Sequence, residues 1–212
     1  MEIVYEKALK HLGKITKSSS KYDTMTVVNG VHYAGNKVEA TDRHRLLQIQ
    51  SNEAEHEEKT LNVQTGEVIN GQYPDLDRLL ISDPDKSIIV LYEQVLGMKK
   101  ILTCIKGLGY QFVAIKKQNH AYYIEPQTKN KEPNYKEDEN ITLQYKIGTT
   151  NEDGTDKRVI DIKYLAEAID FIKETKTYTN LEIINNVLAP IQFSQSESKH
   201  RYHYLICPIR QY

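Results

Sequence analysis

Side chains that could perform catalysis or bind a metal are scattered along this sequence. Seven histidines are present, but only His200 and His203 lie close together, and no partner ligands at zinc spacing accompany them. The acidic clusters Glu57-Glu58 and Glu137-Asp138-Glu139 lie in polar stretches typical of solvated loops. No glycine-rich phosphate loop and no G-x-S-x-G motif occurs. We therefore expect a protein that is not an enzyme and that uses no cofactor and no metal.

The composition limits the choice of partners. The 212 residues are 39% hydrophobic, which is enough for a core, and 28 Lys plus Arg nearly balance 29 Asp plus Glu. A net charge of -1 argues against a general nucleic-acid binder but permits a locally basic face. Cys104 and Cys207 lie far apart and predict free thiols in a reducing compartment. No apolar leader or membrane-length run occurs, so we expect a soluble, cytoplasmic protein without membrane contact.

Two predicted helices carry lysine on the sides that do not enter a core. Apolar residues at helical spacing predict helices over 4–17, 91–106 and 161–176, the last capped by Asp161. Gly13 lowers the stability of the first helix by up to about 1 kcal/mol relative to Ala. A lysine stripe is either a solvated face or a surface for phosphates, which needs positive charge without base-specific groups. The stripe residues are Lys7, Lys10, Lys14 and Lys17 on the first helix and Lys99, Lys100 and Lys106 on the second.

Short strands separated by turn residues fill the rest of the chain. In the first part, strands are expected at 24–28, 30–34, 37–40 and 46–50, then an acidic loop at 51–59 and a hairpin over 61–70. After an extended connector at 71–80, strands are expected at 87–90, 111–116, 121–125, 141–147, 158–160, 181–184, 191–194 and 202–210, with a polar loop at 127–140. The second part thus repeats a β-α-β-β-β unit. These patterns predict an α+β protein of helices and antiparallel strands.

A polar corner, Thr41-Asp42-Arg43, joins two of these strands, since Asp and Thr can bond their own backbone and hold a turn. The segment Ala40-Thr41-Asp42-Arg43-His44-Arg45-Leu46 resembles Ala-Thr-Asp-Gly-His-Arg-Leu of the bacterial DNA sliding clamp, the β subunit of DNA polymerase III. Gly71-Gln72-Tyr73-Pro74-Asp75-Leu76 resembles the family's Gly-Arg-Phe-Pro-Asp-Tyr. Tyr204-Leu205-Ile206-Cys207-Pro208-Ile209-Arg210 resembles its terminal Tyr-Val-Val-Met-Pro-Met-Arg. Arg43 replaces the family's Gly, which predicts a difference in backbone geometry or access at the corner.

The resemblance implies a DNA-clamp fold, with helices on one face of antiparallel sheets. In this fold residues 1–84 form an abridged clamp-like domain and residues 85–212 a complete one. It also implies that the three segments meet in a pocket for partner peptides, with an apolar floor and Arg groups at its rim. Such a pocket suits a peptide that carries Leu and Phe side chains. The residues that match the family's pocket are Thr41, His44, Arg45, Leu46, Pro74, Arg78, Leu79, Leu205, Ile206, Cys207, Pro208, Ile209 and Arg210.

The function implied by the resemblance is that of a replication processivity or recruitment factor. Lysine-bearing helices would face double-stranded DNA weakly and without sequence preference, and the pocket would dock DNA polymerase or other replication proteins. Clamp rings in general close with six domains, so a two-domain chain would form a homotrimer joined head to tail. The alternative is a monomeric phage- or plasmid-type homologue that binds peptides without encircling DNA.

Overall fold

The computed structural model describes residues 2–19, 26–127, 142–151, 154–196 and 199–210. Contacts between Cα atoms separate two compact units, residues 1–83 with 192–206 and residues 84–191 with 207–212. The predicted boundary after residue 84 lies close to the first of these boundaries, whereas residues 192–206 are predicted to belong to the second part. The predicted polar loop at 127–140 lies, apart from Gln127, outside the described residues.

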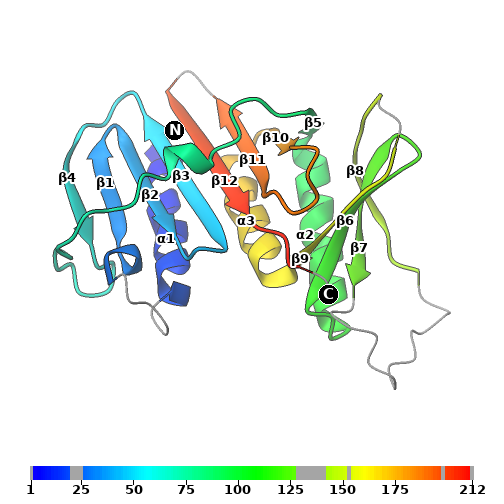
Figure 1. Cartoon of the computed structure of the whole chain (residues 1–212), viewed down its shortest axis with the longest axis horizontal. Coiled ribbons are helices and arrows are strands. Elements are labelled where there is room, and N and C mark those ends of the chain that lie inside the picture. The colour runs from blue at the N-terminus through cyan, green and yellow to red at the C-terminus, as the bar shows by residue number, and fades with distance from the viewer. Residues whose placement is uncertain (1, 20–25, 128–141, 152–153, 197–198, 211–212) are drawn as a thin grey trace. The chain divides into compact units, whose positions relative to one another are not determined.

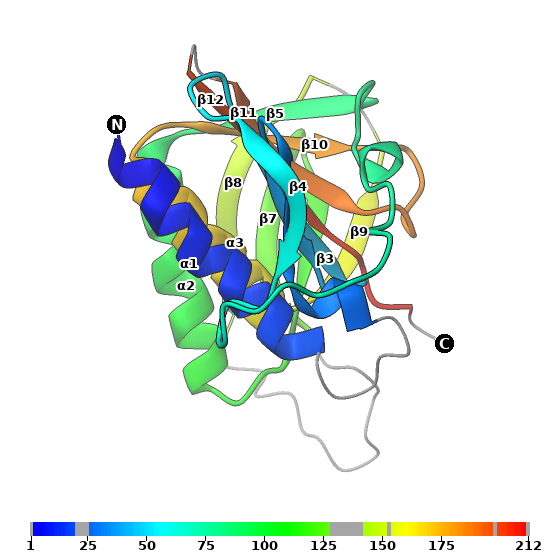
Figure 2. The same cartoon turned by 90° about the vertical axis from the view of Figure 1, so that its left-hand side faces the viewer.

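The first unit is one helix packed against a sheet. Helix α1 (Glu2–Ser19) runs along one face of strands β1 (Val31–Gly35), β2 (Lys37–Thr41) and β3 (Arg45–Ser51) (Figure 1 and Figure 2). The helix buries Ala8, Leu12 and Ile15, as their spacing predicts. Strands β4 (His56–Leu61), β12 (His200–Ile206) and β11 (Ile191–Ser196) extend the sheet in the order β4-β1-β2-β3-β12-β11.

Gly13 in the middle of α1 has a packing role. A Cβ atom at this position would lie 3.0 Å from Cγ1 of Val63, a tight contact that would require the Val63 side chain to move by a few tenths of an ångström. Val63 belongs to the predicted hairpin at 61–70, which is closed by a bridge between Leu61 and Val68. This close packing accounts for the presence of glycine in the middle of a helix, where it costs about 1 kcal/mol relative to alanine.

Two secondary-structure predictions in this unit are wrong. The sequence predicts a strand over 24–28, whereas Thr26–Asn29 forms a 3-10 helix (η1) with Val27 and Val28 buried. A run of two apolar residues carries no periodicity that separates strand from helix. Residues 51–59 are predicted to be a loop, yet His56–Leu61 is β4, paired antiparallel with β1. Glu57, Glu58 and Lys59 are exposed on it, because an edge strand can be charged where an inner strand alternates.

The second unit contains the repeated pattern. Its elements are β5 (Lys86–Val90), α2 (Tyr92–Gly107), β6 (Phe112–Gln118), β7 (Ala121–Gln127), β8 (Tyr145–Thr149), β9 (Asp156–Asp161), α3 (Ile162–Thr175) and β10 (Thr179–Ile183). Followed by β11 and β12 in the chain, this order is β-α-β-β-β twice, as predicted. One antiparallel sheet has the order β8-β7-β6-β9, β5 pairs with β10, and α2 packs against α3.

Local chemistry sets the ends of both helices in this unit. Asp161 caps α3, as predicted, by accepting a hydrogen bond from the backbone N–H of Lys163 at 2.8 Å. Lys176 ends α3 in the left-handed conformation, with a φ of 57°. At the start of α2, the side chain of Gln94 accepts from the N–H of Leu91 at 2.7 Å. None of the helices in the described ranges is long and apolar enough to cross a membrane.

Candidate functional site

The corner between β2 and β3 is organised by the carboxylate of Asp42. Its Oδ1 accepts hydrogen bonds from the backbone N–H groups of His44 at 3.1 Å and Arg45 at 3.0 Å. Its Oδ2 accepts from Nε of Arg45 at 2.9 Å, and both side chains of this ion pair are buried. Thr41 Oγ1 accepts from the N–H of Arg43 at 3.1 Å and donates to the carbonyl of Arg45 at 2.8 Å. The corner is therefore held by the side chains that the sequence analysis selected for this purpose.

Arg43 occupies the exposed tip of the corner with a φ of 70°, in the left-handed region. A residue with a Cβ atom is disfavoured there by about 1–2 kcal/mol, whereas glycine adopts the region readily. Arg43 stands where the resembling family has glycine. The substitution thus leaves a glycine-type backbone in place and adds a long charged side chain next to exposed His44.

Leu46 and Leu205 belong to a buried apolar cluster in the first unit. The register of β3 and β12 places the two residues opposite each other. Leu46 is only 2% exposed, because neighbouring side chains cover it. The other members are Val27, Val28, Tyr73 and Leu76, with Ile69 and Leu80 packed against them.

The connector, residues 71–80, is attached to the sheet near its start and just beyond its end. Tyr73 stacks on His32 of β1, with ring centroids 4.3 Å apart. At the other end, the N–H and carbonyl of Ile81 each bond the side chain amide of Gln192 at 3.0 Å. Between these points, a 3-10 turn, η2 (Asp77–Leu79), interrupts the predicted extended conformation. Of the predicted pocket residues on the connector, Pro74 is half-buried, Arg78 is exposed and Leu79 is 49% exposed.

Residues 207–210 belong to the second unit, where they run beside β9. The N–H of Ile209 donates to the carbonyl of Val159 at 2.7 Å, and Ile209 packs against a cluster that includes Phe112 and Val159. Strand β12 therefore ends at fully buried Ile206 and does not continue to residue 210 as predicted. Pro208 has no N–H with which to extend a ladder. Cys207 and Pro208 are half-buried and Arg210 is exposed.

The structure thus divides the thirteen predicted pocket residues between the units. Nine lie in the first unit, on the corner, the connector and the end of β12; four, from Cys207 to Arg210, lie in the second. In the first unit the sequence segments far apart in the chain do converge, because Leu46 and Leu205 share one cluster with the connector residues Tyr73 and Leu76.

The loop between β10 and β11 also presents apolar side chains, and the sequence analysis did not single it out. Val187 and Leu188 are 52% and 56% exposed. Buried Arg158 on β9, paired with Asp156 at 3.2 Å, holds this loop through backbone carbonyl groups. Its signal in the sequence is a single arginine in β9, next to the apolar pair Val159 and Ile160, and its carbonyl acceptors lie at least 26 residues away. These acceptors are the carbonyl groups of Ile184, Ala189 and Pro190.

The lysines predicted to face DNA differ in how exposed they are. On α1, Lys7, Lys10 and Lys17 are exposed and Lys14 is half-buried. On α2, Lys100 and Lys106 are exposed, whereas Nζ of Lys99 lies 2.6 Å from a carboxylate oxygen of Asp170 on α3. Three of the four α1 lysines are exposed, whereas Lys99 of α2 is paired with Asp170, so α1 is the better candidate for a surface that contacts phosphates.

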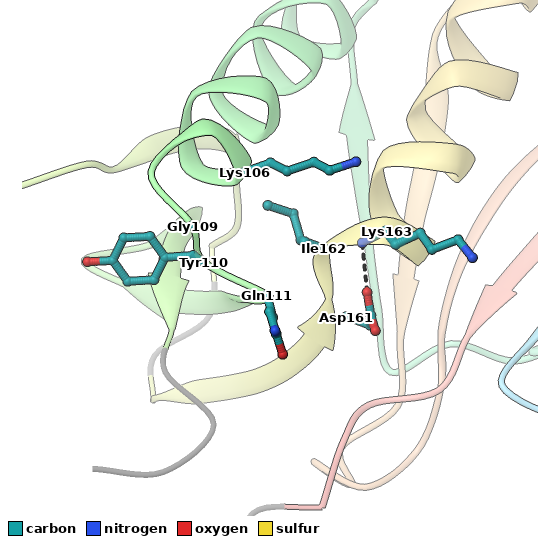
Figure 3. Close-up of a pocket in the computed structure, with 7 residues that line it drawn as sticks. All are labelled: Lys106, Gly109, Tyr110, Gln111, Asp161, Ile162 and Lys163. Carbon is teal, nitrogen blue, oxygen red and sulfur yellow. Dashed lines mark hydrogen bonds between the residues drawn. The ribbon is translucent and has the colours of Figure 1, made fainter. Parts of the chain in front are cut away.

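An open pocket of about 350 Å³ lies at the start of α3 in the second unit. Figure 3 shows Lys106 at the end of α2 and Lys163 on α3, with Asp161 capping the helix beside them. The remaining lining residues are Gly109, Tyr110, Gln111 and Ile162. Within the described ranges, no three His, Cys, Asp or Glu side chains are grouped to hold a metal ion.

Solved structures with the same arrangement of elements are DNA sliding clamps. The Helicobacter pylori β clamp in complex with diflunisal matches with a TM-score of 0.71 and 14% identity, over 96% of this chain and 63% of that one. The Bacillus subtilis DNA polymerase sliding clamp matches with a TM-score of 0.71 and 14% identity, over 97% and 62%. The Thermotoga maritima DNA polymerase III β subunit matches with a TM-score of 0.68 and 14% identity, over 98% and 64%. No protein-family model and no curated protein matches the sequence.

This chain has a sliding-clamp-like α+β fold in abridged form, as the sequence predicts. It spans about 63% of the length of the solved clamps. At 14% identity the likeness concerns the fold, and the roles of individual residues rest on the geometry described above.

Proposed function

We propose that this chain acts without catalysis as a sliding-clamp-like replication factor that docks short peptides of partner proteins and contacts double-stranded DNA weakly. The observation that carries the proposal is the shared cluster of Leu46 and Leu205 beside a rigid corner, within a clamp-like fold. A preorganised surface loses little entropy when a peptide binds, which favours docking at this corner.

The groups that would contact a peptide are the exposed ones that flank the cluster. On the first unit these are His44, Arg78 and Leu79. Leu79 would bury apolar surface, and Arg78 would bind peptide carbonyl or carboxylate groups. The buried members, among them Leu46, would support these side chains from below.

Leu79→Ser tests the peptide site. Leu46 is unsuitable because a polar side chain at a 2% exposed position would unfold the unit. Calorimetry with a peptide that contains Leu and Phe should show affinity about tenfold weaker for Leu79→Ser, the loss expected for part of one buried leucine. Leu108→Ser is the matched control, since Leu108 is 46% exposed and lies in the second unit outside the predicted site. Equal affinities of the parent and Leu79→Ser would contradict the assignment.

The DNA-facing role belongs to α1 in this proposal. Changing exposed Lys7, Lys10 and Lys17 to Glu should abolish a weak, sequence-independent and salt-sensitive retention of duplex DNA, while peptide binding stays intact. The control carries an equal charge change on strand lysines, Lys59→Glu, Lys146→Glu and Lys157→Glu, all of which are exposed. If both triple variants lose DNA equally, net charge alone controls binding, and the α1 stripe is only a solvated face.

We propose that three chains assemble into a ring when the protein contacts DNA. Head-to-tail closure would pair free sheet edges, and β4 and β8 are end strands in the two sheets. Light scattering at micromolar concentration should then give about 73 kDa, three times the chain mass of 24.5 kDa. A stable species of 24.5 kDa would contradict the ring and leave peptide docking as the function.

A further inference from the structure

A row of polar side chains crosses the sheet of the first unit beneath the connector. The strand register places His32 beside Glu39, Glu39 beside Gln48, and Gln48 beside His203. His32, Glu39 and Gln48 are buried, and Gln48 bonds to Asp77 of the connector. A sheet face under a covering segment is ordinarily apolar, because buried polar groups are costly unless they are hydrogen-bonded. The hydrogen bonds of Gln48 to Glu39 and Asp77 therefore point to a role for these buried polar side chains in holding the connector.

Asp77 attaches the middle of the connector to the row. Nζ of Lys37 donates to its two carboxylate oxygens at 2.9 Å and 2.8 Å. Nε2 of Gln48 donates to Oδ1 of Asp77 at 2.7 Å and to Glu39 at 2.9 Å, so one amide group joins two carboxyl groups. The hydrogen bond from Lys37 lowers the pKa of Asp77, whereas burial raises the pKa of Glu39. Asp77 is thus the carboxylate that stays ionised opposite the lysine.

Asp77 is also the first residue of the turn that carries two exposed side chains of the proposed peptide site. The N–H of Leu79 bonds the carbonyl of Leu76 at 3.0 Å, and the N–H of Leu80 bonds the carbonyl of Asp77 at 3.1 Å. Arg78 and Leu79 are exposed, so burial of their own side chains does not fix them. Their position depends on the residues that hold the turn on the sheet.

We propose that Asp77, Lys37 and Gln48 form a latch that positions Arg78 and Leu79 for peptide docking. The inference rests on the proposed peptide site and adds Asp77 as a positioning residue, which acts through its neighbours in the turn. An exposed turn without such an attachment samples several conformations, and a peptide must then select one of them. Holding the turn in one conformation reduces the entropy lost on binding.

Asp77→Ala in the full chain tests the latch. The affinity for the peptide containing Leu and Phe should fall about fivefold. This is the change in affinity expected when the turn loses the net stabilisation of about one hydrogen bond. Hydrogen exchange at the amides of Leu79 and Leu80 should become faster, while the amide of Ile81, held separately by Gln192, keeps its protection. Asp83→Ala is the control, since it removes an exposed carboxylate a few residues away.

A charge reversal distinguishes the latch from a general loss of structure. Lys37→Asp combined with Asp77→Lys should recover part of the affinity and of the amide protection, whereas each single variant should not. Unchanged exchange at Leu79 and Leu80 in Asp77→Ala would overturn the latch, as would equal loss of protection at Ile81. A parent chain that binds no such peptide would overturn the proposed function and with it the docking role of Asp77, while the exchange data would still decide whether the latch exists.

Discussion

Replacing Asp42 by Ala is expected to remove much of the stability of the first unit. The Asp42 carboxylate accepts from two backbone N–H groups and from Nε of Arg45, at distances of 2.9 to 3.1 Å. In this ion pair, the Arg45 side chain is 0% exposed and the Asp42 side chain is 2% exposed. Water therefore cannot take the place of the carboxylate unless the corner opens.

The magnitude follows from the groups that the substitution leaves behind. Removing one partner of a buried ion pair costs about 3–5 kcal/mol. The N–H groups of His44 and Arg45 also lose their acceptor, at about 1 kcal/mol each. A native domain is stable by about 5–15 kcal/mol, so Asp42→Ala should remove a third of the free energy of unfolding or more. Asp42→Asn keeps one acceptor oxygen for the N–H groups and should cost less.

Urea denaturation measures the effect. The 15 tyrosines and the absence of tryptophan make circular dichroism and tyrosine fluorescence the suitable probes. The double variant Asp42→Ala with Arg45→Leu should be more stable than Asp42→Ala alone, because it leaves no charge buried. A loss below about 1 kcal/mol for Asp42→Ala, the value of an exposed pair, would refute the reasoning. A double variant less stable than the single one would refute it as well.

Two further substitutions test local geometry and buried charge. Arg43→Gly should be more stable than Arg43→Ala by about 1 kcal/mol in thermal denaturation, because the φ of 70° disfavours any Cβ atom; equal stability would exclude left-handed strain. Burial raises the pKa of Glu39 above its ordinary value, so the parent loses stability as the pH rises through that raised pKa. Glu39→Gln cannot ionise and should therefore gain stability relative to the parent between pH 4 and pH 8 in urea denaturation, by about 1 kcal/mol for each unit by which the pKa is raised. A difference between the two proteins that is independent of pH would contradict the assignment.

Local patterns in the sequence predicted the elements that depend on local physics. The helices follow from apolar residues at helical spacing, and the cap of α3 follows from Asp161, whose side chain reaches an N–H two residues away. The corner at Asp42 was predictable for the same reason, since its bonds span three residues or fewer. The repeated order of strands and helices followed from these elements. It was sufficient to predict the clamp-like fold together with the three matching segments.

Tertiary structure decided what depends on residues far apart in the chain. Strand register, which no local pattern encodes, places Leu46 opposite Leu205 and aligns the polar row from His32 to His203. Strand β4 could not be predicted from its charged sequence, because a strand at the edge of a sheet does not need alternating apolar residues. Residues 207–210 leave β12 because the carbonyl of Val159 accepts the N–H of Ile209. The sequence by itself thus determined the helices, most of the strands and the chemistry of the corner, because these depend on neighbouring residues. Long-range pairing decided which segments of the chain lie side by side and which connector residues the sheet holds, because those contacts join residues far apart in the chain.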